Sequence, residues 1–262
     1  MIDKMSHPHV VAIIQARMGS TRLPGKTLAD VHGKPLLAHV IERVNASQAI
    51  RSIMIATTTQ PIDLQISAMA TQCGVGSYAG SVSDVLDRYY QVGMLVSADV
   101  IVRITADDPF KDPQVIDKVV RYFLDHPGLD YASNTIEPSY PEGLDVEVFS
   151  FGALQRAWRE AKLPSEREHV TPYVWENPNE FNVANIKHHE DLSHLRWTID
   201  YEEDLRFARE VYARLHHGQV FLMEEILALL RQEPELERIN EGVQRNEGYL
   251  RTLKREKGYS DT

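Results

Sequence analysis

Residues 10–26 read VVAIIQARMGSTRLPGK, and this stretch decides the fold class. Its first part, Val10–Gln15, is an apolar run of strand length, and the rest is a loop that contains Gly19, Pro24 and Gly25. A helical pattern follows, with apolar residues recurring on one face at Leu36, Leu37, Val40, Ile41 and Val44. A buried strand, a loop and an amphipathic helix in this order are typical of the first unit of a parallel sheet.

The same alternation continues along the chain. We predict further strands at 52–56, 75–78 and 100–104, and helices at 61–73, 82–97 and 113–126. The second half is looser, and there we predict strands at 144–149, 182–187 and 196–199 and helices at 151–160 and 166–176. The sequence therefore predicts an α/β protein with a mostly parallel sheet. We assign one domain to residues 1–232 and a charged, helical, solvated tail to residues 233–262.

Composition excludes several classes of protein. With 262 residues, 43% of them hydrophobic, the chain can bury a sizeable core, which excludes disorder as the dominant state. The net charge of -10 opposes binding to nucleic acid or to an anionic membrane. Cys73 is the only cysteine, which excludes an internal disulfide and fits a reducing compartment. The apolar runs are too short to span a bilayer, and MIDKMSHPHV lacks the apolar core of a signal peptide. We expect a cytoplasmic protein.

The loop at 15–26 carries three cations, Arg17, Arg22 and Lys26, and no acidic residue lies within 10–29. Loops at the carboxyl ends of parallel strands are where α/β sheets bind ligands. Guanidinium and ammonium groups can each take a separate phosphate oxygen. Backbone N–H groups could complete an anion nest at Gly19, Ser20, Thr21 and Gly25. The alternative is a solvated surface loop, and neither the P-loop spacing nor GxGxxG is present.

Acidic residues follow the strand predicted at 100–104, in the sequence RITADDPFKDP. Asp107 and Asp108 would lie at the same edge of the sheet as the basic loop. Mg²⁺ typically takes one or two carboxylates together with phosphate oxygens of the substrate. The alternative is local turn bonding before the proline that follows. We interpret Asp107 as a metal ligand and Asp112 as the cap of the next helix.

Another candidate is Asp200, in the sequence RWTIDYEEDL. Its spacing leaves two roles open, a site carboxylate or a capping box with Glu203. Asp145 and Glu147 alternate with valines on a predicted strand, so they face either solvent or a pocket for a polyhydroxylated ligand. Two roles are also open for Glu168, His169 and Thr171: they line the same pocket, or they lie on a helix surface and serve local capping. The adjacent histidine pairs do not favour a metal site.

The motifs resemble a known family. AIIQARMGSTRLPGKTL (12–28) followed by GKPLL (33–37) resembles the signature of cytidylyltransferases that activate acidic sugars, the group containing the CMP-KDO and CMP-sialic acid synthetases. The branch named after spore coat polysaccharide biosynthesis protein F is more similar still. Its features occur in order over roughly residues 10–210, as IATTT (55–59), GSVSDVLDRYY (80–90), RITADDPFKDP, YPEGLDVEVFS (140–150), EREHVTPYVWENP (166–178) and RWTIDYEEDL.

The resemblance implies a Rossmann-like, three-layer α/β sandwich of the nucleotide-diphospho-sugar transferase (GT-A-like) type, often dimeric. It implies that CTP binds over the first loop and that an Mg²⁺-dependent reaction releases pyrophosphate. It makes Arg17, Arg22 and Lys26 the catalytic cations. The metal ligands would be Asp107 and Asp200. Further nucleotide-binding residues would be Ala16, Gly19, Ser20, Thr21, Ser83 and Thr105, and the acceptor would meet Asp145, Glu147 and Glu168. The family's better-known synthetases tend to carry Gln and Gly at the positions of Thr105 and Ala106.

We therefore expect a substrate oxygen to attack the α-phosphorus of CTP while the cations stabilise the leaving pyrophosphate. The acceptor is an acidic sugar or a phosphorylated small molecule, and the product serves surface polysaccharide biosynthesis. We expect a homodimer with no nucleic-acid or membrane partner. The alternatives are a nucleotidyltransferase for another nucleotide or acceptor, a glycosyltransferase that consumes a sugar nucleotide, and a non-catalytic nucleotide-binding protein.

Overall fold

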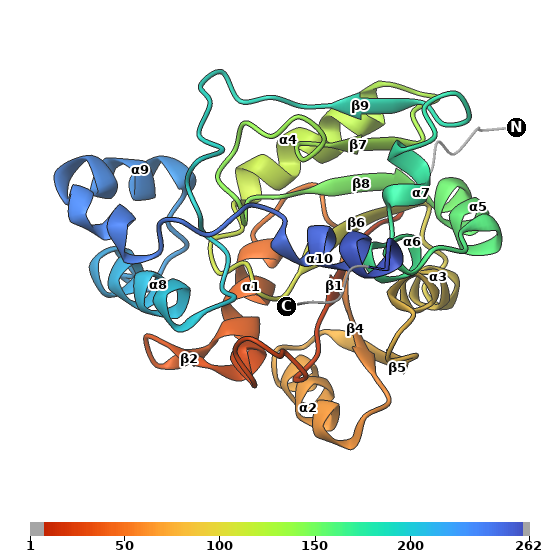
Figure 1. The fold of residues 1–262 in the computed structure, drawn as a ribbon. Coiled ribbons are helices and arrows are strands. Elements are labelled where there is room, and N and C mark those ends of the chain that lie inside the picture. Colours follow the sequence, from red (N-terminus) through yellow and green to blue (C-terminus); the bar gives the residue numbers. More distant parts are fainter. Residues whose placement is uncertain (1–7, 259–262) are drawn as a thin grey trace, which may run out of the picture.

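A seven-stranded mixed sheet forms the centre of the computed structural model, which describes residues 8–258 (Figure 1). The strand order is β5-β4-β1-β6-β8-β7-β9. Pairing is parallel from β5 through β6 and between β7 and β9, whereas β8 is antiparallel to both of its neighbours. The strands are β1 (Val10–Gln15), β4 (Ser52–Thr58), β5 (Gly76–Gly80), β6 (Val100–Thr105), β7 (Tyr131–Ser133), β8 (Glu147–Ser150) and β9 (Val183–Asn185), and β2 (Asp30–Val31) and β3 (Lys34–Pro35) form a separate hairpin.

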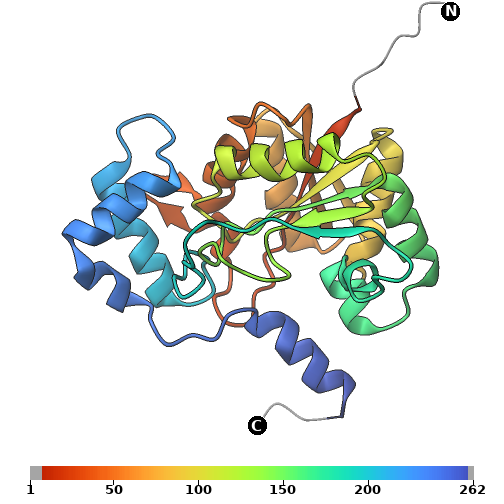
Figure 2. The same cartoon turned by 90° about the horizontal axis from the view of Figure 1, so that it is seen from above.

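Helices cover both faces of the sheet (Figures 1 and 2). Successive residues of β1 point to opposite faces, so Val10, Ala12 and Ile14 join one core cluster while Val11 and Ile13 join the other. The first cluster includes residues of helices α1 (Leu36–Asn45), α2 (Leu64–Gln72) and α4 (Pro113–Asp125). The second includes residues of helices α3 (Val85–Leu95), α5 (Phe151–Glu160) and α7 (Pro172–Trp175). The result is a three-layer sandwich.

The helices are α1 (Leu36–Asn45), α2 (Leu64–Gln72), α3 (Val85–Leu95), α4 (Pro113–Asp125), α5 (Phe151–Glu160), α6 (Pro164–His169), α7 (Pro172–Trp175), α8 (Glu202–Leu215), α9 (Met223–Gln232) and α10 (Glu247–Glu256). Residues 8–258 also contain the short 3-10 helices η1 (Lys26–Leu28), η2 (Pro61–Asp63) and η3 (Pro234–Ile239). No helix in the described part of the chain is long and apolar enough to cross a membrane.

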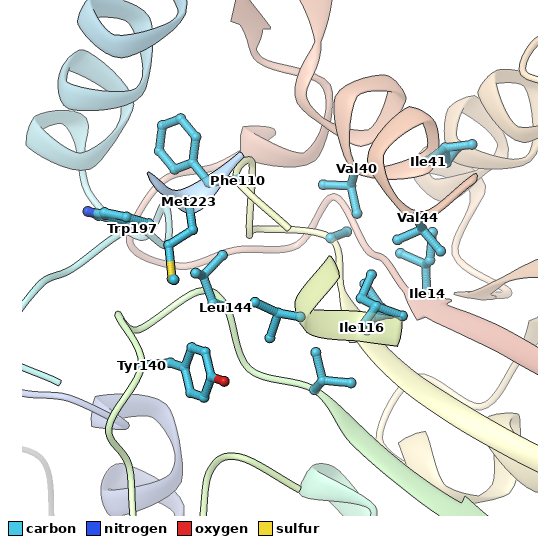
Figure 3. Packing of buried hydrophobic residues seen from close by; sticks show 14 of the residues in the cluster. Ile14, Val40, Ile41, Val44, Phe110, Ile116, Tyr140, Leu144, Trp197 and Met223 are labelled. Atoms are coloured by element: carbon cyan, nitrogen blue, oxygen red, sulfur yellow. The ribbon is translucent and has the colours of Figure 1, made fainter. Parts of the chain in front are cut away.

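An aromatic cluster anchors the loop after β6 to the later helices. Figure 3 shows Phe110, Trp197 and Met223 grouped in the core. The ring of Phe110 lies 6.1 Å from that of Trp197 and 5.6 Å from that of Tyr212 on α8. The hydroxyl of Tyr212 donates to the carbonyl of Pro109 at 2.7 Å. Because the loop is held at its base, the acids that precede Phe110 have fixed positions.

The predicted α/β class and mostly parallel sheet are confirmed. The strand predicted at 196–199 is wrong, because the segment forms only a single bridge, between Arg196 and Glu142. Its apolar residues are buried as the pattern suggested, but its backbone bonds go to loops. The N–H of Ile199, for example, donates to the carbonyl of Asp107 at 2.8 Å. This pairing brings two distant acids together.

Two further boundaries differ from the prediction. The helix predicted at 166–176 is divided into α6 and α7, because Val170 adopts a positive φ of 73° and Pro172 starts a new turn. The strand predicted at 144–149 begins only at Glu147, so Asp145 lies in the preceding segment. β7 and the hairpin of β2 and β3 were not predicted, since two or three residues are too few to show a period.

The tail predicted at 233–262 is helical in its described part, where it forms η3 and α10. It is not simply solvated as predicted, because α10 packs against α6 and buries Thr252. The assignment of a domain boundary at 232 stays a prediction. Residues 1–7, on which part of the signal-peptide expectation rests, and residues 259–262 of the tail lie outside the described range.

Candidate functional site

The basic loop is a folded element and not a loose surface segment. Its start is fixed where β1 ends, since the N–H of Ala16 donates to a carbonyl of β4 at 3.1 Å. The N–H of Met18 donates to a carboxylate oxygen of the buried Asp63 at 2.7 Å. Gly25 has a φ of 76°, a conformation that favours glycine, and its N–H donates to the carbonyl of Met18 at 3.2 Å. The chain then enters η1 at Lys26.

Lys26 lies between the two predicted metal ligands. Its ammonium donates to Asp107 Oδ2 at 2.8 Å, to Asp200 Oδ1 at 2.8 Å and to the carbonyl of Ile199 at 2.6 Å. Burial opposes the charge, but the two carboxylates outweigh it and raise the pKa of Lys26. Burial also disfavours the Asp200 carboxylate, yet Lys26 and Arg22 lower the pKa of Asp200 to about 2. Within this cluster, Lys26 and Asp200 are therefore both charged at neutral pH.

Asp200 faces this cluster because another residue caps the helix. Asp204 accepts from the N–H groups of Asp200 at 2.8 Å and Tyr201 at 2.9 Å, whereas Glu203, the predicted capping partner, is exposed. The second oxygen of Asp200 lies 3.1 Å from the guanidinium of Arg196, which also contacts Asp204 at 2.9 Å. The capping interpretation of Asp200 is therefore wrong, and its side chain instead joins the charged cluster of the site.

A cavity of about 300 Å³ opens above the basic loop. Among the described residues that line it, six are Lys or Arg and three are Asp or Glu, so its wall is cationic. The predicted site residues on its wall are Ala16, Arg17, Ser20, Thr21, Arg22, Lys26, Thr105, Asp107, Glu168 and Asp200. Gly19 and Ser83 are exposed and do not line it.

A second cavity of about 370 Å³ adjoins the first, and its wall is acidic. Asp145 and Glu147 line it, together with the aromatic rings of Trp175 and Tyr249. Glu147 is buried, and although burial disfavours its charge, Arg103 lowers its pKa. The two cavities share lining residues at Gln15, Arg22, Thr105, Asp107, His169, Asp200 and Gly248. Glu168 lines the first cavity and not the second.

One glycine makes this arrangement possible. Gly143 has a φ of 103°, and a Cβ there would lie 2.7 Å from the backbone C and O atoms of Trp197. The neighbouring N–H of Glu142 donates to Leu195 O at 2.9 Å, and the N–H of Trp197 donates to Glu142 O at 2.7 Å. Because residue 143 is a glycine, the segment before β8 can lie directly against the segment that leads to Asp200.

Arg88 lines the cationic cavity, although the sequence suggested it only as a possible counter-charge for the acceptor, together with Arg103 and Arg167. Its side chain is buried on α3 and lines the cavity, and its Nε atom is buried without a hydrogen-bond partner among the described residues. Burial lowers the pKa of Arg88, so the site holds a desolvated cation there. Arg88 follows Val85 by three residues and precedes Tyr89, and both of these are buried on α3. This spacing could have placed Arg88 on the buried face of the helix.

The carboxylates of Asp107 and Asp200 fit a divalent cation of the Mg²⁺ type. Both contact the same ammonium, and their side chains are 30% and 12% exposed, so they are accessible from the cavities. The described residues contain no group of three or more His, Cys, Asp or Glu that could hold a metal by itself. Two carboxylates are enough to hold Mg²⁺ when phosphate oxygens of the substrate complete its coordination.

The chain matches the cytidylyltransferase family over residues 11–239. It belongs to that family. Spore coat polysaccharide biosynthesis protein SpsF of Bacillus subtilis is 32% identical to this cytidylyltransferase over 233 residues, which are 86% of this chain and 95% of that protein. A solved cytidylyltransferase from Leptospira borgpetersenii has a TM-score of 0.86 at 30% identity, over 91% of this chain and 100% of that chain. The solved CMP:2-keto-3-deoxy-manno-octonic acid synthetase complexed with CTP shares the fold, with a TM-score of 0.61 at 20% identity over 78% of this chain and 98% of that one.

These findings confirm the predicted family and the nucleotide-diphospho-sugar transferase-like fold. This cytidylyltransferase is a nucleotidyltransferase related to SpsF and to the 3-deoxy-manno-octulosonate cytidylyltransferases. The glycosyltransferase and the non-catalytic nucleotide-binding protein are set aside by that membership. Nucleotidyltransferases of this kind generally depend on a metal ion.

Proposed function

We propose that this cytidylyltransferase couples CTP to a sugar in an Mg²⁺-dependent reaction that releases pyrophosphate. The observation that carries the proposal is the meeting of two cavities of opposite charge at Asp107, Asp200 and Arg22. A triphosphate suits the cationic cavity, and a hydroxyl-rich acceptor suits the acidic one, because carboxylates accept hydrogen bonds from hydroxyls. The α-phosphorus would then lie at the boundary, where the acceptor oxygen can reach it.

The triphosphate would lie along the basic loop. Arg17 is half-exposed and can turn toward an incoming phosphate, since its nearest carboxylate, Glu168, is 3.9 Å away. Arg22 contacts both Asp200 and Glu247, so a phosphate would compete with these carboxylates for it. Arg88 would supply a desolvated cation that is already fixed in place. These cations would stabilise the charge that develops on the leaving pyrophosphate.

Asp107 and Asp200 would hold the metal ion, which supplies Lewis-acid stabilisation of the reacting phosphate. Before the metal ion binds, Lys26 would keep both carboxylates in position. The site needs no covalent nucleophile, because positioning and electrostatics supply most of the catalysis in phosphoryl transfer. We further predict that Ala16, Ser20, Thr21 and Thr105 contact the nucleotide. A nucleotide contact by Gly19 and Ser83 also stays a prediction.

The acceptor would bind in the acidic cavity. Asp145 and Glu147 would accept from its hydroxyls, and Trp175 offers an aromatic face for the sugar ring. A carboxylate or phosphate on the acceptor would need a cation, and Arg22 and Arg103 are the ones in that wall. Acidic sugars and phosphorylated small molecules both remain candidates. Glu168 lies on the nucleotide side, which favours a role in closing the first cavity. A homodimer and a part in surface polysaccharide biosynthesis remain predictions.

Pyrophosphate release tests the proposal. CTP, ATP, GTP and UTP would each be offered with Mg²⁺ or with EDTA against neutral sugars, acidic sugars and phosphorylated small molecules. We expect release with CTP and one acceptor only when Mg²⁺ is present. Asp107→Asn should lower kcat by about 100-fold or more. The matched control, Asp125→Asn, changes an exposed acid outside both cavities and should leave kcat unchanged. Release that needs no divalent cation, or near wild-type turnover by Asp107→Asn, would contradict the proposal.

A further inference from the structure

Helix α10 borders both cavities although it lies beyond the residues that match the family, 11–239. Figure 1 shows it crossing in front of the central strands, and Figure 2 shows it outside the layered core. Gly248, Arg251, Thr252 and Arg255 line the nucleotide cavity. Their spacing of three and four residues places them on one helical face. The helix therefore presents a defined face, with two arginines on it, to the site.

The helix is docked by specific contacts. The hydroxyl of Thr252, which is buried, donates to Glu168 at 2.9 Å and lies 3.2 Å from a ring nitrogen of His169. At the far end, the hydroxyl of Ser165 donates to Glu256 at 3.1 Å. These bonds tie α10 to α6. They hold the helix face that carries the arginines beside the cavity. The charge of this segment alone would not place it there.

Glu247, the first residue of α10, links this helix to the basic loop. Its carboxylate lies 3.0 Å from Arg22 and 3.1 Å from Arg251, and it accepts from the hydroxyl of Tyr201 at 2.8 Å. One carboxylate is thus shared by a cation of the loop and a cation of the helix. The side chain of Arg251 is 30% exposed, so it can reach a ligand in the cavity without leaving the helix.

We propose that Arg251 and Arg255 bind phosphate oxygens of the nucleotide, so that α10 forms the outer wall of the nucleotide site. This inference rests on the proposed function, because it takes the cationic cavity as the triphosphate site. The phosphates replace Glu247 as the partner of Arg22 and Arg251, and the helix encloses the bound nucleotide. Loop and helix then grip the same polyphosphate from opposite sides, each with guanidinium groups that suit its oxygens.

Equilibrium binding of CTP and of inorganic tripolyphosphate to the full chain tests this. The variant carries Arg251→Gln and Arg255→Gln. The matched control is Lys254→Gln, which removes the same charge from an exposed position of the same helix outside both cavities. We expect the double variant to bind both ligands at least tenfold more weakly and the control to stay within about twofold of wild type. A second double variant, Arg251→Lys with Arg255→Lys, keeps the charge but not the planar guanidinium, so it should lose less affinity than the glutamine variant.

Each outcome has a separate meaning. Unchanged CTP and tripolyphosphate affinity in the glutamine variant would overturn the inference and leave the proposed function standing. Equal loss in the lysine and glutamine variants would also overturn it, since the helix would then act through its packing and not its charge. Arginine-dependent binding of tripolyphosphate without binding of CTP would overturn the proposed function alone. Binding of neither ligand by wild type would overturn both.

Discussion

Replacing Lys26 by methionine removes a cation from between two carboxylates while keeping the apolar stem. The Lys26 side chain is 11% exposed, and its ammonium donates to three oxygens at 2.6 to 2.8 Å. Breaking a buried ion pair by removing one partner costs about 3–5 kcal/mol. Asp200 keeps Arg22 and Arg196, and Asp107 is partly exposed, so we expect a loss at the lower end, about 3 kcal/mol.

Mg²⁺ makes this prediction specific. Without Lys26, the two carboxylates lose the ammonium that competes with a metal ion for them, so the variant should bind Mg²⁺ about tenfold more tightly than wild type. At saturating Mg²⁺, a tenfold higher affinity raises the free energy of unfolding of the variant by about 1.4 kcal/mol relative to that of wild type. The deficit measured in EDTA, about 3 kcal/mol, should therefore shrink to about 2 kcal/mol in Mg²⁺.

Urea unfolding in EDTA and in saturating Mg²⁺ measures both values. Lys34→Met serves as the matched control, because Lys34 pairs with Glu42 at the surface and should cost no more than about 1 kcal/mol, with no effect of Mg²⁺. A deficit in Lys26→Met that is the same in both buffers would refute the idea that metal and ammonium compete for one carboxylate pair. Wild-type stability in EDTA would refute the claim that Lys26 holds the cluster together.

Burial lowers the pKa of His39 from its usual 6.5 to about 4. The contribution of His39 to stability is therefore full above pH 6.5, and the free energy of unfolding should fall by about 3 kcal/mol as the pH drops to 4. Urea unfolding at several pH values should show a weaker pH dependence for His39→Gln than for wild type. Gly143→Ala should destabilise the fold by about 2 kcal/mol or more in urea unfolding, because its new methyl would overlap the backbone of Trp197. Glu147→Gln should cost about 3 kcal/mol or more in the same assay, because the guanidinium of Arg103 loses the charge of its buried carboxylate partner.

Matched substitutions separate these causes from general sensitivity. Gly128 also has a positive φ, 99°, but a Cβ there meets nothing within 4 Å, so Gly128→Ala should cost less than Gly143→Ala. Glu137 pairs with a lysine at the surface, so Glu137→Gln should change stability by less than about 1 kcal/mol. Equal effects within either pair would contradict the reasoning, as would an unchanged pH slope in His39→Gln.

Much of the fold follows from local pattern. The apolar run of β1 and the spaced apolar residues of α1 each lie within one short window, and strand and helix periods are visible on that scale. The basic loop was identified because its cations and glycines are adjacent in sequence. Asp107 could be assigned to the site because β6 is parallel to β1, which brings the loops after both strands to one edge. These inferences need only the order of the elements.

The remaining features depend on contacts between distant residues. Asp200 has two local interpretations, and only the packing of Asp204 against its backbone N–H decides between them. Likewise, the charge and helical spacing of 247–256 fit a solvated helix equally well, and docking on α6 decides otherwise. Neither outcome is encoded in a window of a few residues.

The sequence by itself determined the α/β class, the basic loop and the cytidylyltransferase family, because periodicity and contiguous motifs are local properties. Only the tertiary structure decided that Lys26 joins Asp107 and Asp200, which are 81 and 174 residues away in the chain. It also decided that one cavity is cationic and its neighbour acidic, and that α10 borders both. Such contacts depend on sheet register and on the closure of long loops, which no local preference specifies.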